Sequence, residues 1–453
     1  MDLVGRWQKL ARDTALLTGS SLIMRCIGMA FQVWLAGRIG ASGVGLYQLV
    51  ASVNMLCATF AISGIRFTTT RLVSEELGAE NPGSIPRAMK RCVLYALVFG
   101  SAAFLVLFTG AEPIGFLWVG DARTVLSLRI IAFRMPFIAL SSVLSGYFLA
   151  CGRAYKSAFV QLLEQLVSIA LVMFFLREVP GGEIERSCAA VSLGGTLADM
   201  VSLLLVSLLY LHDRRHHHSH RSGSVKLTGR MFKIAVPLAL SAYARTSLTT
   251  LQNLLIPRKL KASGLSADSA LAGYGTISGM VMPIITFPTC LLYALSELLI
   301  PNLTEAQVSG DFSYIDRTVS SLLRIALLFA LSVSAFLLLT ADAIGWHIYH
   351  ADHLGKYIRL LAPLIPFMYL DIVTDGCLKG LGQMIHSMRY NISEALLGVL
   401  MVAGLLPVFA LNGYIFVLYF CELFNFTLSI RRLKKIAHIR LFSPQQPQKA
   451  PMT

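Results

Sequence analysis

Residues 134–165 read RMPFIALSSVLSGYFLACGRAYKSAFVQLLEQ, and residues 364–395 read LIPFMYLDIVTDGCLKGLGQMIHSMRYNISEA. The two stretches align without a gap at an offset of 230 residues. Identical residues recur in this alignment: Pro136, Phe137, Leu140, Val143, Gly146, Gly152, Ser157 and Glu164 match Pro366, Phe367, Leu370, Val373, Gly376, Gly382, Ser387 and Glu394. Chance rarely aligns a proline, two glycines and a glutamate in one register, so we interpret the chain as an internal duplication.

The sequence around the two copies is strongly apolar. Of its 453 residues, 55% are hydrophobic and 14% are charged, whereas a soluble domain carries about 25% charged residues. A membrane-spanning helix needs roughly 20 mostly apolar residues. Apolar windows of this kind lie at residues 14–37, 44–67, 91–111, 125–150, 157–177, 187–211, 231–256, 272–299, 319–341, 355–378, 389–410 and 411–431. We therefore expect an all-α polytopic membrane protein with about twelve transmembrane helices.

The duplication divides these windows into two sets of six. We expect an N-terminal lobe at residues 1–211, a cytoplasmic linker at 212–229, a C-terminal lobe at 230–432 and a basic, polar cytoplasmic tail at 433–453. Lys and Arg concentrate in alternate loops and in both terminal segments, which predicts that both termini are cytoplasmic. The exception is the basic cluster at residues 258–261. Parallel repeats of six spans are typical of secondary transporters, in which one half rocks against the other.

Arginines inside the apolar windows are candidate substrate-binding residues, because ionisable groups are costly in a membrane and usually mark function. Arg25 lies near the middle of the first window, and Arg245 lies at a comparable depth in the seventh. Arg66 and Arg134 are further candidates, although Arg66 is close enough to a window end to reach the cytoplasmic boundary. Guanidinium groups bind phosphate oxygens in pairs. These arginines favour an anionic substrate, while the alternative is an internal salt bridge.

Acidic residues inside the windows are candidates for ion coupling or for structural roles. Glu164 and Glu394 are repeat-related, which suggests a shared structural task such as pairing with an arginine. Asp371 aligns with Ser141 and has no acidic counterpart in the first copy. It is therefore the stronger candidate for coupling transport to an ion or a proton.

No motif predicts catalysis, a cofactor or a metal site. The sequence contains no G-x-x-x-x-G-K-[ST] loop, nucleophile elbow, H-E-x-x-H or C-x-x-C pattern. The histidine run at residues 212–226 invites a metal-binding interpretation, but a solvated linker is the simpler one. The net charge of +15 is spread over loops as a topology signal rather than gathered for nucleic acid. We expect neither an enzyme nor a nucleic-acid-binding protein.

Four stretches resemble the stage V sporulation protein B group of the multidrug/oligosaccharidyl-lipid/polysaccharide (MOP) exporter superfamily, which also holds the lipid II flippases and the MATE drug exporters. They are GASGVGLYQLVASV at residues 40–53, SGIRFTTTRLVSEELGAEN at 63–81, LIPRKLKASGLSADSALAGYGTISGMVMPIITFP at 255–288 and LSELLIPNLTEA at 295–306. The resemblance covers nearly the whole chain. It implies two six-helix lobes around a cavity and flipping of a polyprenyl-diphosphate-linked saccharide for wall or spore-cortex synthesis across the bacterial cytoplasmic membrane.

The resemblance also implies a cationic cavity with arginines in the first helices of both lobes, and Arg25 and Arg245 match this pattern best. Members usually carry two further C-terminal helices that line a groove for the lipid tail, whereas this sequence turns basic at Arg431 and then polar. The expected partners are an anionic lipid-linked saccharide and membrane lipids. The expected energy source is H+, Na+ or the membrane potential, and we expect the protein to be a monomer.

Two alternatives stay open. A cation-coupled multidrug exporter of the MATE type is disfavoured by the arginines and by the lack of an acid in the first window. A membrane-embedded glycosyltransferase is disfavoured by the short outer loops.

Overall fold

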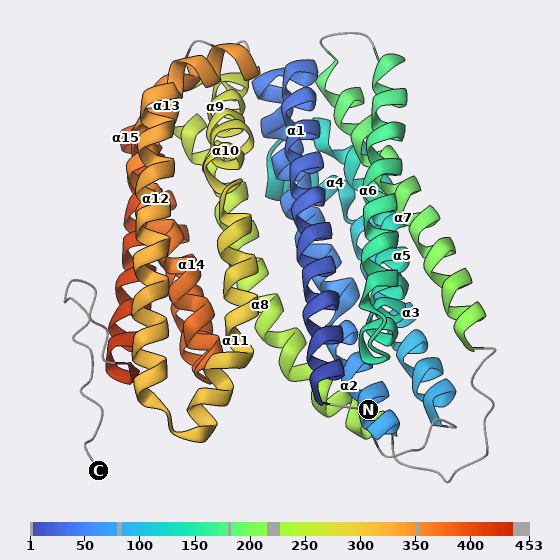
Figure 1. The fold of residues 1–453 in the computed structure, drawn as a ribbon. Coiled ribbons are helices and arrows are strands. Elements are labelled where there is room, and N and C mark those ends of the chain that lie inside the picture. Colours follow the sequence, from blue (N-terminus) through green and yellow to red (C-terminus); the bar gives the residue numbers. More distant parts are fainter. Residues whose placement is uncertain are drawn as a thin grey trace, which may run out of the picture. The chain divides into compact units, whose positions relative to one another are not determined.

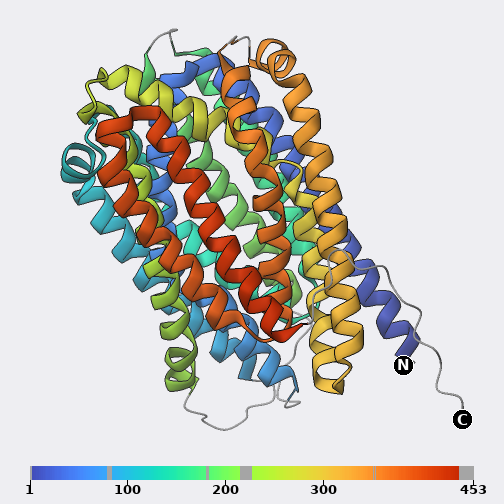
Figure 2. The same cartoon turned by 90° about the vertical axis from the view of Figure 1, so that its left-hand side faces the viewer.

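The structure is a computed structural model that describes residues 3–78, 84–179, 183–214, 227–349, 351 and 353–437, and within these ranges every regular element is a helix (Figures 1 and 2). The tail beyond Ala437 and residues 215–226 of the linker lie outside the described residues. The helices are α1 (Leu3–Ile62), α2 (Ile65–Gly78), α3 (Ile85–Thr109), α4 (Ala111–Pro113), η2 (Ile114–Val119), η3 (Ala122–Thr124), α5 (Val125–Ala150), α6 (Ala154–Arg177), α7 (Ile184–Arg214), α8 (Leu227–Ala262), α9 (Ala267–Tyr274), η4 (Gly275–Val281), α10 (Met282–Thr286), α11 (Thr289–Ser309), α12 (Phe312–Tyr349), α13 (Leu354–Leu361), η5 (Ala362–Leu364), α14 (Ile365–Gly380) and α15 (Met384–Ile436).

Nine segments of the described chain are long and apolar enough to cross a membrane, and two of them hold two spans each. The backbone leaves the helical region at Gly40 inside α1, where φ is 69° and ψ is 174°. It does so again at Ala410 inside α15, where φ is 49° and ψ is −132°. A straight helix as long as α1 would measure about 90 Å, three times the hydrocarbon thickness. With α8 as the seventh span, the prediction of an all-α polytopic membrane fold with about twelve spans is confirmed.

Contacts between the helices define two compact units. Unit 1 comprises Met1–Phe287, Ile348–His350 and Ala395–Tyr414, and unit 2 comprises Pro288–His347, Ala351–Glu394 and Ile415–Thr453. Helices α8 to α10 therefore belong by their contacts to unit 1. The lobe boundaries at residues 211 and 230 stay a prediction, and the two units are described separately below.

Helix α5 lies at the centre of unit 1, where it packs against α2, α3 and α7. The second arm of α1, after Gly40, packs against α9 and η4. This approach is so close that a Cβ atom on Gly275 would lie 2.1 Å from the carbonyl oxygen of Ala41, and one on Gly45 would lie 2.2 Å from that of Leu271. Only glycine fits at both positions.

We expect Gly275→Ala to lower the free energy of unfolding by about 1–3 kcal/mol, because the added methyl group must push α1 and η4 apart. Gly37→Ala is the matched control, since a Cβ atom there would have no neighbour within 4 Å. Thermal unfolding of the purified protein in detergent measures both variants. An equal melting temperature for Gly275→Ala and the wild type would contradict the close contact.

The duplication inferred from the sequence is visible in the local structure of both units. Gly152 follows α5 and Gly382 follows α14, and both adopt a φ of 67°. Gly146 approaches the backbone of Arg66, and its counterpart Gly376 approaches Ser296, which is 230 residues after Arg66. The prolines differ: α5 runs uninterrupted through Pro136, whereas Pro366 stands in the first turn of α14 after the short helix η5.

Candidate functional site

Arg25 lies in the first arm of α1, and its side chain is exposed. The adjacent turn is fixed against α6, because Gln165 Nε2 donates a hydrogen bond of 2.8 Å to the carbonyl of Met24. Gly28 makes room for the same glutamine side chain, since a Cβ atom there would lie 3.0 Å from its Nε2 atom. Packing on α6 therefore fixes this part of the arm.

Arg245 lies on α8, and its side chain is also exposed. Neighbouring residues bind α8 to the second arm of α1: the hydroxyl of Thr59 bonds to that of Thr246 at 3.4 Å, and the hydroxyl of Thr250 donates to the carbonyl of Ser52 at 3.1 Å. Among the residues that the structure describes, none forms an ion pair with Arg245.

Arg66 lies just after a break in the second span. Ser63 and Gly64 both have positive φ values, 44° and 70°, and separate α1 from α2. Two tyrosines hold this break, because the hydroxyls of Tyr95 and Tyr243 lie 2.8 and 2.6 Å from the Ser63 hydroxyl. Two residues further on, the exposed side chain of Arg66 lines a cavity inside unit 1.

This cavity, called the serine cavity below, has a volume of about 320 Å³, which is room for several water molecules. Its ionisable groups are Arg66, Glu164 and Asp199. Ser157 is only 5% exposed, and its hydroxyl has no hydrogen-bond partner among the described residues. The remaining lining residues are Ile138, Ser141, Ser142, Ser145, Val160, Gln161, Ser202 and Val206.

Arg134 pairs with an acid of unit 1 that the sequence had not assigned to it. Its Nε atom lies 2.5 Å from Oδ2 of Asp199, and the exposed fractions of the two side chains are 21% and 7%. Glu164 lies next to Asp199 and close to Arg134. The internal salt bridge considered for the arginines is therefore present at Arg134, while its role in substrate binding stays a prediction.

In unit 2, Asp371 lies in a group of acidic residues, called the acid cluster below: Asp371, Asp375, Glu394 and Glu422. The charges of Glu394 and Glu422 lie close enough to interact with that of Asp371. Lys379 pairs with Asp375 at 2.5 Å, and no ion pair between described residues reaches Asp371. The structure thus concentrates acidic side chains around Asp371.

A buried asparagine completes this arrangement. Asn425 is 6% exposed, and its Nδ2 atom donates to Asp371 at 3.1 Å and to Asn391 at 3.2 Å. The remaining oxygens, Oδ1 of Asp371 and Oδ1 of Asn425, are buried and have no donor among the described residues. Buried acceptors without donors are costly, and oxygen atoms of this kind are the ligands that hard cations prefer.

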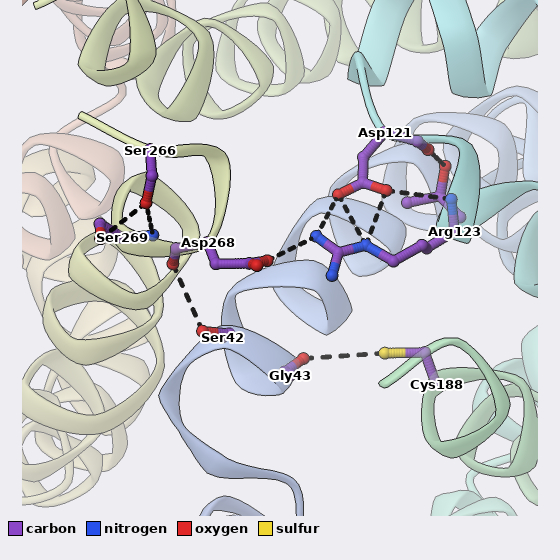
Figure 3. Close-up of polar contacts among 9 residues, drawn as sticks. Ser42, Gly43, Asp121, Arg123, Cys188, Ser266, Asp268 and Ser269 are labelled. Atoms are coloured by element: carbon purple, nitrogen blue, oxygen red, sulfur yellow. Dashed lines mark hydrogen bonds and ion pairs between the residues drawn. The ribbon is translucent and has the colours of Figure 1, made fainter. Parts of the chain in front are cut away.

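A second ionic group, around Arg123 in unit 1, was missed in the sequence (Figure 3). The guanidinium group binds Asp121 through Nε and through Nη2, the latter at 2.7 Å, and the same Nη2 atom reaches Asp268 at 3.0 Å. Asp268 lies in the first turn of α9, and its carbonyl oxygen accepts a bond from Ser42. These contacts join the segment before α5 to α9.

We expect Arg123→Ala to lower the free energy of unfolding by about 1–3 kcal/mol, because the side chain of Asp121, 15% exposed, loses its guanidinium donors and keeps, within the described residues, only the backbone N–H of residue 123. Asp268→Asn is the matched comparison and should cost less than about 1 kcal/mol, because Asp268 is 68% exposed. Chemical or thermal unfolding of both variants checks the order. Equal losses of unfolding free energy in the two variants would show that Asp121 does not need the guanidinium group of Arg123 as a donor.

Arg258, one member of the basic cluster that departs from the positive-inside pattern, makes a structural contact. Its guanidinium group donates to the carbonyl oxygens of Leu117 and Val119 at the end of η2. Carbonyl groups at a helix end carry partial negative charge, so this arginine acts as a structural tie there. A local loop contact of this kind leaves no periodic signal in the sequence.

The fold is that of a multi-pass α-helical membrane protein with charged side chains inside its spans, and comparison with known proteins places it among the transporters of the MOP superfamily. The family described as "Polysaccharide biosynthesis protein" matches residues 10–307, and the MatE family matches residues 259–403. The chain belongs to the polysaccharide biosynthesis protein family.

Among its relatives, stage V sporulation protein B of Bacillus subtilis (strain 168) is 25% identical over 412 residues, which cover 89% of this chain and 78% of that protein. Lipid II flippase MurJ of the same organism is 21% identical over 421 residues, which cover 86% and 75%. The fold is similar to the inward-facing conformation of a multidrug resistance MATE family transporter, with a TM-score of 0.71, 14% identity, and coverage of 91% of this chain and 95% of the other. Exporters and flippases, rather than catalysts, are thus its relatives.

Proposed function

We propose that this chain is a flippase that moves a polyprenyl-diphosphate-linked saccharide across the bacterial cytoplasmic membrane by alternating access, with both termini in the cytoplasm. The observation that carries the proposal is the presence of exposed arginines, Arg25, Arg66 and Arg245, inside membrane-spanning segments. A cation in a span is retained where it performs a function. The apolar window at residues 14–37, in which Arg25 lies, contains no acidic residue.

Diphosphate chemistry fits these side chains. A guanidinium group stays charged at any working pH and binds two phosphate oxygens at once, and the headgroup of a lipid diphosphate is the most strongly anionic part of such a substrate. The family description and the name of the relative lipid II flippase MurJ support a polysaccharide or wall precursor. Neither supplies the identity of the saccharide.

We assign the acid cluster of unit 2 to energy coupling. Asp371 and Asn425 each present a buried oxygen for which the described residues supply no donor, and a sodium ion or a proton would satisfy them. If the inward-open and outward-open states bind the cation with different affinities, the cation shifts the populations of the two states. The size of this shift is limited by the difference in affinity.

The second candidate function is cation-coupled export of drugs, which the match to the MatE family favours. A substrate that is itself a cation would be repelled by Arg25, Arg66 and Arg245, so we rank this function below the flippase. Accumulation of cationic dyes in cells separates the two: export of dyes by the wild type that is lost in Asp371→Asn would establish the exporter.

Genetic rescue tests the flippase. The wild-type chain is expressed in cells depleted of their lipid II flippase, with membrane levels confirmed by immunoblotting. Growth of the depleted cells is the expected result. If the wild type reaches normal levels and fails to rescue these cells, and also fails in cells lacking other polysaccharide flippases, then the proposal is wrong.

A further inference from the structure

The internal repeat brings the polar groups of the two units into register. At the offset of 230 residues, counterparts in units 1 and 2 are Ser141 and Asp371, Gln161 and Asn391, Glu164 and Glu394, Gly195 and Asn425, Asp199 and Ser429. The unit 1 members line the serine cavity or the cavity next to it. The unit 2 members lie around Asp371, which contacts both Asn425 and Ser429. The two polar groups are therefore two versions of one ancestral site.

In unit 1, a side chain supplies the positive charge of this site. The guanidinium group of Arg134 lies against Asp199 and in a cavity shared with Glu164 and Gly195. Gly195 faces the guanidinium group, because a Cβ atom there would lie in ordinary van der Waals contact with Nη1 of Arg134, at 3.6 Å. A larger residue at position 195 would exclude it.

In unit 2, the position that corresponds to Arg134 holds no charged side chain, and the position that corresponds to Gly195 is filled by a larger residue. The counterpart of Arg134 is Leu364, which is 2% exposed, and the counterpart of Gly195 is Asn425. The side-chain amide of Asn425 binds Asp371 in place of a guanidinium group. Within the described part of the chain, two buried oxygens of this group have no donor, and no ion pair reaches Asp371.

We propose that Arg134 is a tethered counter-ion, which occupies in unit 1 the place that an exchangeable monovalent cation or proton occupies in unit 2. The site of unit 1 is then permanently satisfied, and coupling is confined to unit 2. The ionisable groups that line the two unit 1 cavities are Arg66, Arg134, Glu164 and Asp199. Without Arg134, Arg66 is the one basic residue left among the described residues that line these two cavities.

The confinement of coupling to unit 2 rests on the proposed role of Asp371, whereas the role of Arg134 is testable on its own. If Arg134 is a tethered counter-ion, removal of its guanidinium group should leave a site in unit 1 whose stability depends on an added cation. Arg134→Leu installs the residue that unit 2 carries at this position. Arg134→Lys is the control that keeps a positive charge.

The test measures thermal unfolding of the purified full-length chain in detergent, with sodium chloride or choline chloride at equal ionic strength and at several pH values. Asp371→Asn is the common background, so that unit 2 does not respond. We expect Asp371→Asn alone to show the same melting temperature in both salts. Addition of Arg134→Leu should lower the melting temperature and make it rise by a few degrees with sodium or with falling pH, because a ligand that binds only the folded state stabilises it.

Two further variants sharpen the result. Arg134→Lys should show no new dependence of the melting temperature on sodium or pH. Glu164→Gln combined with Arg134→Leu should lose the dependence that Arg134→Leu creates, because one acid of the pair is then neutral. A folded Arg134→Leu variant whose melting temperature ignores both sodium and pH overturns the proposal. A different result is that Arg134→Leu creates a sodium response, while the wild type and Asp371→Asn respond to sodium equally. This result would retain the tethered counter-ion and reject the coupling role of Asp371.

Arg134→Leu on its own has a risk of misfolding, because removal of one partner of a buried ion pair is strongly destabilising. The double variant Arg134→Leu, Asp199→Asn then carries the test. If the guanidinium group only neutralises Asp199, the double variant should accumulate and unfold near the wild-type temperature. Failure of the double variant to accumulate would show that Arg134 does more than balance a charge, and would contradict the proposal.

Discussion

Alanine at Arg25 or at Arg245 is expected to reduce the rate of lipid-precursor flipping by about ten- to a hundredfold. Each change removes a charge-assisted contact to a diphosphate, which is worth about 1.5–3 kcal/mol, and 1.4 kcal/mol corresponds to a factor of ten. Both side chains are exposed, so little packing is lost and the protein should still accumulate. The rate is measured as exposure of a labelled lipid precursor in cells at matched protein levels.

Two controls separate a specific role of these arginines from a general need for charge. Lysine at either position keeps the charge but not the paired donors, so it should restore part of the activity. Arg129→Ala removes another exposed arginine, which pairs with Glu112 at 2.5 Å, and should leave the rate unchanged. Full activity in both alanine variants would keep the flippase proposal but reject these site residues.

Asp371→Asn is expected to abolish the dependence of transport on a sodium or proton gradient, with the rate falling to the level seen without a gradient. Asparagine is nearly isosteric with aspartate, and it removes the charge that would bind the cation. Because no ion pair between described residues reaches Asp371, the variant should be at least as stable as the wild type. Transport in proteoliposomes with imposed gradients measures the first effect, and thermal unfolding measures the second.

Asp375→Asn provides the contrast for this prediction. Asp375 is held by Lys379 and by the hydroxyl of Ser387, so its neutralisation should lower stability while the ion dependence of transport is kept. The assignment of Asp371 would be wrong if Asp371→Asn still followed the gradient, or if Asp375→Asn lost the response and Asp371→Asn did not.

The sequence predicted the fold well, because apolar windows and the internal repeat are long-range signals that each span many residues. Breaks inside spans were harder to place. Ser63 interrupts the second span with a left-handed backbone that two tyrosine hydroxyls hold, and tertiary contacts of this kind are not encoded near Ser63. The last break, in contrast, falls at Ala410, where the eleventh apolar window ends.

For the candidate site, the sequence identified the charged residues but not their partners. Arg134 and Asp199 lie 65 residues apart in different helices, and only packing of α5 on α7 brings them together. The repeat did contain one usable signal. Arg134 and Gly195 align with Leu364 and Asn425, so a charge and the space for it change together between the two copies.

Direct flipping by the purified chain tests the central claim. The wild type is reconstituted in liposomes whose inner leaflet carries a fluorescent polyprenyl-diphosphate-linked saccharide, and a membrane-impermeant quencher reports each molecule that reaches the outer leaflet. The account predicts quenching well above that of protein-free liposomes, and a return toward that background when Arg25 and Arg245 are both alanine. Quenching equal to the protein-free background for folded wild-type protein, with and without sodium and proton gradients, would contradict it.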